Sequence, residues 1–150
     1  MPRVTRKAVI DATPDEAYRV VSDPRRLSDW WPRVIRVEDM AGRPGAERTR
    51  WTNVLEADSG RKLRMDYRCV AATSPERYTW EHELEGTPFE KHMSRQTTEV
   101  RLAAKGDRTE VRLESFHGLK GSARLAGFMM RKSQREMLDR ALAGLESLFT

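Results

Sequence analysis

Residues 9–24 read Val-Ile-Asp-Ala-Thr-Pro-Asp-Glu-Ala-Tyr-Arg-Val-Val-Ser-Asp-Pro and carry two helix starts directly after an apolar strand pattern. Thr13 is a favourable N-cap, and Pro14 suits the first position of a helix. Glu16 completes a capping box with Thr13. We therefore expect a strand over residues 3–11, followed by a helix that runs to about Ser22.

The second helix start lies at Asp23 and Pro24, where an acidic cap again precedes a proline. A short helix that holds Leu27 should follow. It should end at Trp30-Trp31-Pro32, because the residue before a proline is disfavoured in the helical region. Two short helices are thus predicted between the first strand and the rest of the chain.

From Val34 to His117 the apolar residues recur mostly with a period of two, which is typical of half-buried strands. Clusters of Gly, Pro, Ser and Asp separate the apolar runs, and the short connections imply an antiparallel meander. The predicted strands cover residues 34–40, 47–57, 61–72, 77–85, 89–104 and 109–117.

The last segment, residues 122–149, has the spacing of a long helix. One face of it carries Met130, Gln134, Met137, Ala141, Leu145 and Leu148. The whole chain, residues 1–150, therefore reads as a single α+β domain with helices near both ends.

The composition excludes several classes of protein. The 28 Lys and Arg exceed the 23 Asp and Glu by a net charge of only +5, and no five of them are consecutive, which argues against nucleic-acid binding. No apolar run approaches the ~18–20 residues of a membrane span. Residues 1–7 lack the apolar stretch of a secretory signal, and Cys69 is the only cysteine. We expect a cytoplasmic protein.

Strand alternation predicts which side chains point inward. Tyr78, Trp80 and His82 share one face of their strand, opposite an acidic face that should be wet. Val100 fixes the phase of the strand over 89–104 and leaves Phe89 and Met93 on the wrong side, which suggests a bulge. The other inward positions, by the same reasoning, include Trp51, Asn53, Leu55, Leu63, Met65, Tyr67, Cys69, His92, Ser94, Gln96, Thr98, Ser115 and His117.

These inward positions mix aromatic and thioether side chains with polar ones. A solid core disfavours such a mixture, because each unpaired buried polar group costs ~1–3 kcal/mol. The mixture is better suited to the wall of a pocket that holds water or a ligand. The predicted ligand-binding residues are Trp51, Asn53, Met65, Tyr67, Tyr78, Trp80, His82, His92, Gln96, His117, Met130 and Met137.

Other chemistry finds less support in the sequence. The three histidines have no short ligand spacing and no predicted acidic partner inside, so we expect no metal. Acid–base catalysis by a pocket histidine stays open. Cys69 has no base beside it on its strand, which disfavours a nucleophile. No phosphate-binding loop or serine-hydrolase elbow is present, and we expect no cofactor.

Residues 9–24, with Leu27 and Trp30-Trp31-Pro32, resemble the opening of the START/Bet v 1-like superfamily, in particular its polyketide cyclase/dehydrase and lipid-transport branch. The hairpin over residues 107–111 and the final helix extend the resemblance over nearly the whole chain. The resemblance implies a helix-grip fold, in which a seven-stranded antiparallel sheet wraps around a long C-terminal helix and a pocket lies between them.

Three functions follow as expectations. The first is binding of an apolar, cyclic or aromatic small molecule in the cavity, by a monomer or homodimer. The second is a polyketide cyclase or dehydrase, in which a pocket His or Tyr moves a proton; the resemblance implies Arg and Ser on the strand at 61–72, where this chain has Leu63, Met65, Tyr67 and Cys69 inward. The third is a protein-interaction module that uses an exposed apolar patch beside the basic final helix.

Overall fold

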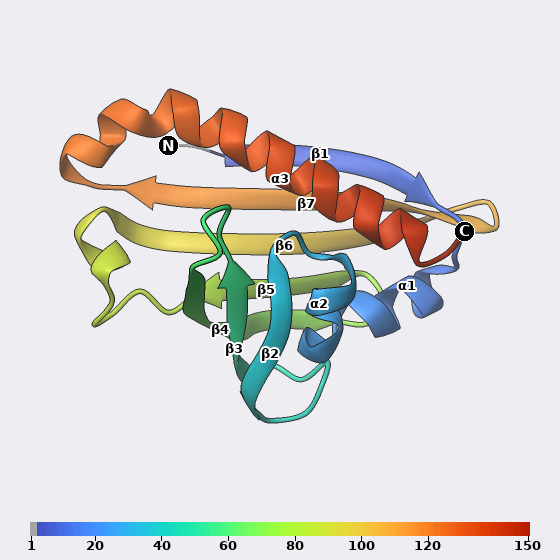
Figure 1. Ribbon diagram of the computed structural model, residues 1–150. Helices are drawn as coiled ribbons and strands as arrows, with labels where there is room; N and C mark the ends of the chain where they lie inside the picture. Colours follow the sequence, from blue (N-terminus) through green and yellow to red (C-terminus); the bar gives the residue numbers. More distant parts are fainter. Residues whose placement is uncertain (1–2) are drawn as a thin grey trace.

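The computed structural model describes residues 3–150 and consists of one curved sheet, a long C-terminal helix and several short helices (Figure 1). The seven strands are all paired antiparallel, in the order β1-β7-β6-β5-β4-β3-β2. Only β1 is out of sequence order, since it pairs with β7 along its whole length. This is the helix-grip architecture that the sequence predicted. The strands are β1 (Arg3–Ile10), β2 (Val34–Ala41), β3 (Arg50–Glu56), β4 (Lys62–Thr73), β5 (Arg77–His82), β6 (Met93–Lys105) and β7 (Arg108–Leu119).

The two predicted helix starts are confirmed. Helix α1 (Pro14–Val21) begins with a complete capping box, in which Thr13 accepts from the backbone of Glu16 and the Glu16 carboxylate accepts from the backbone of Thr13. The Asp23-Pro24 step begins a 3-10 turn, η1 (Pro24–Arg26), that continues into α2 (Leu27–Trp30). Both helices bury apolar side chains, and α2 carries Trp30 into the core.

The sheet is strongly curved, and β2 and β3 run nearly crosswise to β6 and β7 in Figure 1. Register shifts interrupt the β4–β5 pairing between Cys69 and Ala71 and the β6–β7 pairing between Met93 and Arg95. Such irregularities bend a strand and increase its twist. The second of them is the bulge expected from the sequence, and it returns Met93 to the concave side.

Helix α3 (Gly127–Ser147), preceded by the 3-10 turn η3 (Gly121–Ala126), crosses the concave side of the sheet. Its C-terminal half buries Leu138, Ala141, Leu142 and Leu145 and packs against α2. An ion pair between Arg6 and Asp139, with nitrogen and oxygen 2.8 Å apart, joins α3 to β1. Of residues 3–150, no helix has the length and apolar character that a membrane span requires.

Three parts of the predicted strands are wrong. Residues 47–49, expected at the start of the strand over 47–57, precede β3, and residues 47 and 48 form a turn. Residues 83–85 lie in a loop, and residues 88–91 form a 3-10 helix, η2 (Pro88–Lys91), instead of the start of β6. The cause of the second 3-10 helix is a third start in which a capping residue precedes a proline, Thr87-Pro88. Thr87 accepts from the backbone of Phe89, and Glu90 accepts from the backbone of Gly86. A further correction concerns the outer face of β5, where Thr79 is buried beneath Glu99, to which its hydroxyl donates.

Candidate functional site

A cavity of about 220 Å³ lies between the first half of α3 and the concave face of the sheet. Strands β3 to β7 supply its walls, α3 its cover, and the end of α2 one corner. Larger hollows lie on the opposite face of the sheet, but ion-paired side chains such as Arg101 and Glu99 line them. The cavity is lined by Trp31, Asn53, Leu55, Met65, Tyr67, Trp80, His82, Met93, Gln96, Thr98, His117, Met130, Gln134 and Met137.

One wall of the cavity is aromatic. The rings of Tyr67 and His82 stack with centroids 4.9 Å apart and planes 26° from parallel. Trp31 meets Trp80 edge to face at 5.4 Å, and both indoles are buried. Four methionines complete the apolar lining, and their flexible thioethers adapt to guests of different shape. This wall presents ring faces and edges to whatever enters.

The other wall holds polar groups in short chains. The Ser115 hydroxyl donates to the side-chain oxygen of Gln134 at 3.1 Å and lies 3.4 Å from Nδ1 of His117, which joins α3 to β7. Next to it on β6, the Gln96 amide donates to the hydroxyl of Thr98 at 3.1 Å. On the aromatic wall, Nδ1 of His82 is buried and makes no hydrogen bond to residues 3–150. The cavity as a whole thus retains hydrogen-bonding capacity.

The electrostatics of the cavity keep it neutral at pH 7. Burial lowers the pKa of His117 to about 4, with a smaller contribution from neighbouring His82. Burial also lowers the pKa of His82, although the charges of Asp66 and Glu83 oppose the shift. Burial raises the pKa of the Tyr67 hydroxyl, which therefore keeps its proton. None of the fourteen lining residues is Asp, Glu, Lys or Arg. The cavity consequently suits an uncharged molecule.

Comparison with known proteins gives a match over residues 1–150 to the family described as polyketide cyclase / dehydrase and lipid transport. The chain belongs to this family. No curated protein sequence matches the chain significantly.

Solved structures share the fold of this family member. A START superfamily protein from Mycobacterium smegmatis aligns with a TM-score of 0.78 and 17% identity over 99% of this chain and 97% of its own. Ginseng major latex-like protein 151 from Panax ginseng aligns with a TM-score of 0.74 and 15% identity over 98% and 96%. The di-domain ARO/CYC BexL of the BE-7585A biosynthetic pathway aligns with a TM-score of 0.73 and 18% identity. The alignment covers 97% of this chain and 48% of BexL.

Nine of the twelve residues predicted to bind ligand come together in this family member's cavity. Strand alternation predicted seven of these nine residues, and the helical spacing predicted the other two, Met130 and Met137. Their contact with a ligand stays a prediction. The seven strand residues are Asn53, Met65, Tyr67, Trp80, His82, Gln96 and His117.

The other three predicted residues lie elsewhere. Trp51 is buried behind the lining, where its ring stacks on Tyr67 at 6.1 Å and its indole N–H donates to Asn53. Tyr78 faces the same side as His82 but lies four residues along β5, about 13 Å away, against Tyr18 of α1. His92 is exposed at the end of η2, as is Ser94 after it, because the chain there is not the regular strand that was expected.

Five lining residues were not among the predicted binding residues. Leu55 and Thr98 lie on faces that were predicted to point inward, and Gln134 lies on the predicted inner face of α3. Met93 reaches the cavity only through the bulge in β6, and Trp31 through the turn that ends α2. The Thr-Pro-Phe-Glu pattern at 87–90 was the available signal for the irregular start of β6.

Within residues 3–150, His, Cys, Asp and Glu side chains form no group of three that could hold a metal ion. Cys69 is buried, and burial raises the pKa of its thiol, which reduces its nucleophilic form at neutral pH. What the cavity offers chemically is therefore apolar contact, hydrogen bonds, and neutral imidazole and phenol groups.

Proposed function

We propose that this protein binds a compact, uncharged, largely apolar cyclic molecule in the cavity beneath α3. The observation that carries the proposal is the uncharged lining, with stacked aromatic rings on one wall and hydrogen-bonding groups on the other. Membership of a family described by polyketide chemistry and lipid transport supports it.

The size of the cavity narrows the class of ligand. Sites for drug-sized molecules typically enclose ~300–1,000 Å³, and this cavity of about 220 Å³ is smaller. It therefore favours a ligand with one or two rings over a long acyl chain. Affinity would come from buried apolar area, at roughly 25 cal/mol per Å².

Hydrogen bonds would fix the orientation of the ligand. Among residues 3–150, the Tyr67 hydroxyl has only the thioether of Met65 as a partner, at 3.8 Å, and sulfur is a weak acceptor. The Gln96 amide and the His117 imidazole lie on the opposite wall. A ring that bears a hydroxyl or carbonyl group at its edge matches this arrangement.

The test is ligand-dependent thermal stability. Naphthol, tetralone and phenylphenol should raise Tm, because a ligand that binds only the folded state stabilises it. Palmitate, which is long and charged, should have little effect. Native mass spectrometry of freshly purified protein should also show a retained small molecule.

A cavity-filling variant provides the control. Met137→Trp should abolish the Tm increase, whereas Ala143→Ser, at an exposed site on the same helix, should preserve it. The proposal fails if the cyclic compounds leave Tm unchanged, or if they stabilise the filled variant as much as the wild type.

A second candidate function is proton transfer on the bound molecule, as in a polyketide cyclase or dehydrase. It is favoured by the neutral imidazole of His82, which stacks on Tyr67, by the neutral imidazole of His117 on the opposite wall, and by the protonated Tyr67 hydroxyl. An imidazole could take a proton from the carbon next to a carbonyl while the phenol hydrogen-bonds to the enolate oxygen that forms. The fold similarity to the ARO/CYC BexL domain is consistent with this chemistry.

Deuterium incorporation into tetralone in heavy water, followed by NMR, tests the second candidate. The wild type should accelerate exchange at the carbon next to the carbonyl. His82→Gln or His117→Gln should slow it while the folded state is retained. Equal rates with and without protein would rule out this chemistry and leave ligand binding unaffected.

A further inference from the structure

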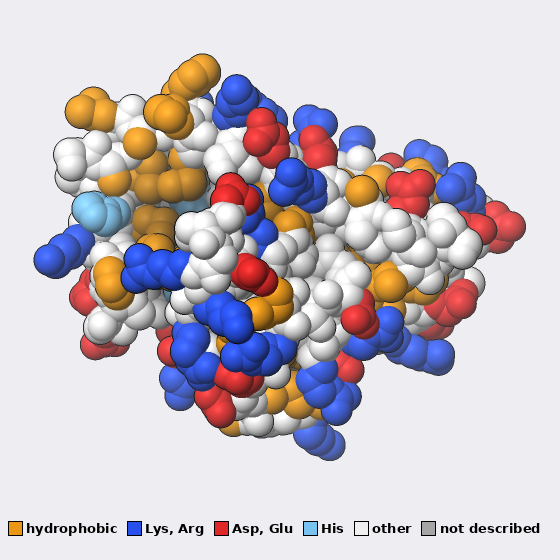
Figure 2. Space-filling view, in the orientation of Figure 1, with side chains coloured by type: hydrophobic (Ala, Val, Ile, Leu, Met, Phe, Trp, Pro, Cys, Tyr) orange, Lys and Arg blue, Asp and Glu red, His pale blue; other side chains and the backbone are white. Residues whose placement is uncertain are grey.

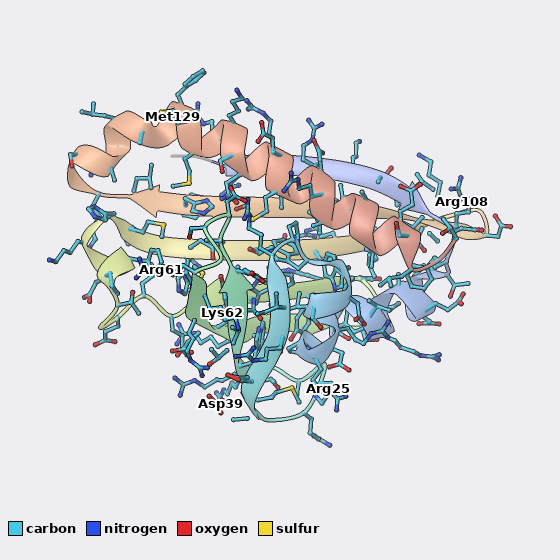
Figure 3. All side chains as sticks on the ribbon, viewed as in Figure 1. Arg25, Asp39, Arg61, Lys62, Arg108 and Met129 are labelled. Carbon is cyan, nitrogen blue, oxygen red and sulfur yellow. The ribbon has the colours of Figure 1, made fainter. Side chains whose placement is uncertain are left out.

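Three apolar side chains at the start of the long helix project into solvent. Leu125 in η3 and Phe128 and Met129 in α3 expose 90%, 75% and 72% of their surface, far more than any other large hydrophobic residue in 3–150. Figure 3 shows Met129 at this end of α3, directed away from the sheet. We call these three residues the apolar tip.

The apolar tip is surrounded by positive charge. Residues 120–135 contain five Lys and Arg and no Asp or Glu, whereas the chain as a whole is nearly balanced. All five are exposed, and none forms an ion pair with residues 3–150. Arg131 and Lys132 follow Phe128 by three and four positions, which makes them its neighbours on the helix surface. The five cations are Lys120, Arg124, Arg131, Lys132 and Arg135.

We propose that the apolar tip and the five cations bind an anionic lipid bilayer surface. A segment with exposed Leu, Phe and Met on one side and flanking Lys and Arg is suited to the headgroup region. There the apolar side chains enter the acyl boundary and the cations meet lipid phosphates. The proposal goes beyond ligand binding and does not depend on it.

A second copy of the chain fits this surface poorly. A self-association through the tip would bring two sets of five cations together, and residues 120–135 contribute no carboxylate to offset them. Three side chains are also far fewer than the ~20–30 residues that each partner contributes to a standard protein interface. A bilayer satisfies both conditions, because it supplies negative charge and accepts a small projecting tip.

The tip lies beside the cavity. Met130, next to Met129, lines the cavity with Met93 from β6. Figure 2 shows the exposed apolar side chains above a hollow whose floor is also apolar. Docking in this orientation would bring the cavity to the lipid surface, where apolar molecules concentrate.

Vesicle cosedimentation tests the proposal. The protein should bind vesicles of phosphatidylcholine mixed equally with phosphatidylglycerol, and bind poorly to phosphatidylcholine alone. Arg131→Gln with Lys132→Gln should weaken binding by roughly 30-fold, at about a factor of five for each cation removed. Phe128→Ser with Met129→Ser should weaken it at least as much.

The matched control removes the same charge elsewhere. Arg43→Gln with Arg108→Gln changes two exposed cations outside the tip, and Arg108 lies at the opposite end of the molecule in Figure 3. This pair should retain binding within about threefold, since surface charges more than a Debye length apart are screened. A Phe128→Trp variant should shift its emission to shorter wavelength on mixed vesicles.

Several outcomes would overturn the proposal. One is absence of binding to mixed vesicles, and another is an equal loss of vesicle binding in the Arg43→Gln, Arg108→Gln control. A third is binding that survives loss of Phe128 and Met129, which would indicate a purely electrostatic contact such as that with nucleic acid. Dimerisation in solution that the Phe128→Ser, Met129→Ser variant abolishes, without vesicle binding, would assign the tip to a second copy. None of these results would alter the ligand-dependent Tm.

Discussion

His117 is a weak base because the fold removes its ring from water. The side chain lies on β7 under α3, is 5% exposed, and contacts the hydroxyl of Ser115. A charged imidazole there would lose its hydration, and none of the fourteen residues that line the cavity is a carboxylate that could compensate, so the neutral form is favoured. The same burial that makes the cavity neutral therefore ties the stability of the fold to pH.

We expect the free energy of unfolding to fall as the pH drops from about 6.5 to about 4. The unfolded chain binds a proton on His117 near pH 6.5, whereas the folded chain does so only near 4. The contribution of neutral His117 to stability is thus complete above pH 6.5. Acidification to about pH 4 should lower the free energy of unfolding by about 3 kcal/mol. Urea unfolding across this range measures it.

Two variants separate this effect from that of the carboxylates. His117→Gln should reduce the pH dependence between 4 and 6.5, because one of the two buried histidines is gone, and the part due to His82 should remain. His92→Gln, at an exposed position, is the control for removal of a histidine side chain. An identical slope in the wild type and His117→Gln would contradict the buried neutral histidine.

Thr13 makes a second prediction at the scale of one residue. Its hydroxyl oxygen accepts from the backbone of Glu16, which satisfies an otherwise unpaired donor at the start of α1. Thr13→Ala should lower the free energy of unfolding by about 1 kcal/mol, as measured by chemical denaturation. Thr13→Asn, which keeps a capping oxygen, should lose much less; equal losses would show that the cap contributes little.

At the scale of elements, α3 and α2 pack so closely that only glycine fits between them. A methyl group at position 144 would lie 2.5 Å from the carbonyl oxygen of Trp30 and 3.1 Å from its Cα. Both are backbone atoms, so a rotamer change cannot relieve the contact. This approach holds the C-terminal half of α3 against the tryptophan that α2 delivers to the core.

Gly144→Ala should therefore destabilise the protein, although alanine is the better helix former by ~1 kcal/mol. Overpacking costs typically 1–3 kcal/mol, and thermal unfolding should show a net decrease in Tm. Ala143→Gly, at the exposed neighbouring position, isolates the helix propensity. A Gly144→Ala protein more stable than the wild type would mean that the helices can separate at no cost.

At the scale of the whole molecule, the two halves of α3 differ in how they pack against the rest of the protein. The C-terminal half lies on buried Leu138, Leu142 and Leu145, whereas the first half covers the cavity and exposes the apolar tip. Segments with few buried contacts open locally at a lower free-energy cost. The cover of the cavity is therefore the part of the helix best suited to admit a ligand.

Hydrogen exchange should resolve this difference. Amides of residues 127–134 should exchange faster than those of residues 138–147, by more than tenfold. A cyclic ligand in the cavity should slow the first group selectively, because Met130 and Gln134 line the binding space. Uniform exchange along α3, with or without ligand, would exclude a lid-like role for its first half.

Most of the fold could be predicted because local signals agreed with one another. The Thr13-Pro14 and Asp23-Pro24 starts gave both early helices, and the period of two gave the strands and their inner faces. The failures cluster around residues 83–94, where a turn and a 3-10 helix interrupt the alternation. Counting in steps of two along a strand cannot be carried across such an interruption. His92 was therefore predicted to point inward but is exposed, and Met93 was predicted to point outward but lines the cavity.

The sequence by itself determined the class of fold and, wherever the strands run without interruption, the face on which the lining residues lie, because capping and alternation depend on neighbours along the chain. Only the tertiary structure decided which inward residues share the cavity. Tyr78 and His82 have the same phase but lie at different distances along a curved sheet. Only His82 lies where the first half of α3 leaves a cavity, whereas Tyr78 is packed in the core against Tyr18. It likewise decided that Phe128 and Met129 remain uncovered, since exposure depends on where α3 lies over the sheet.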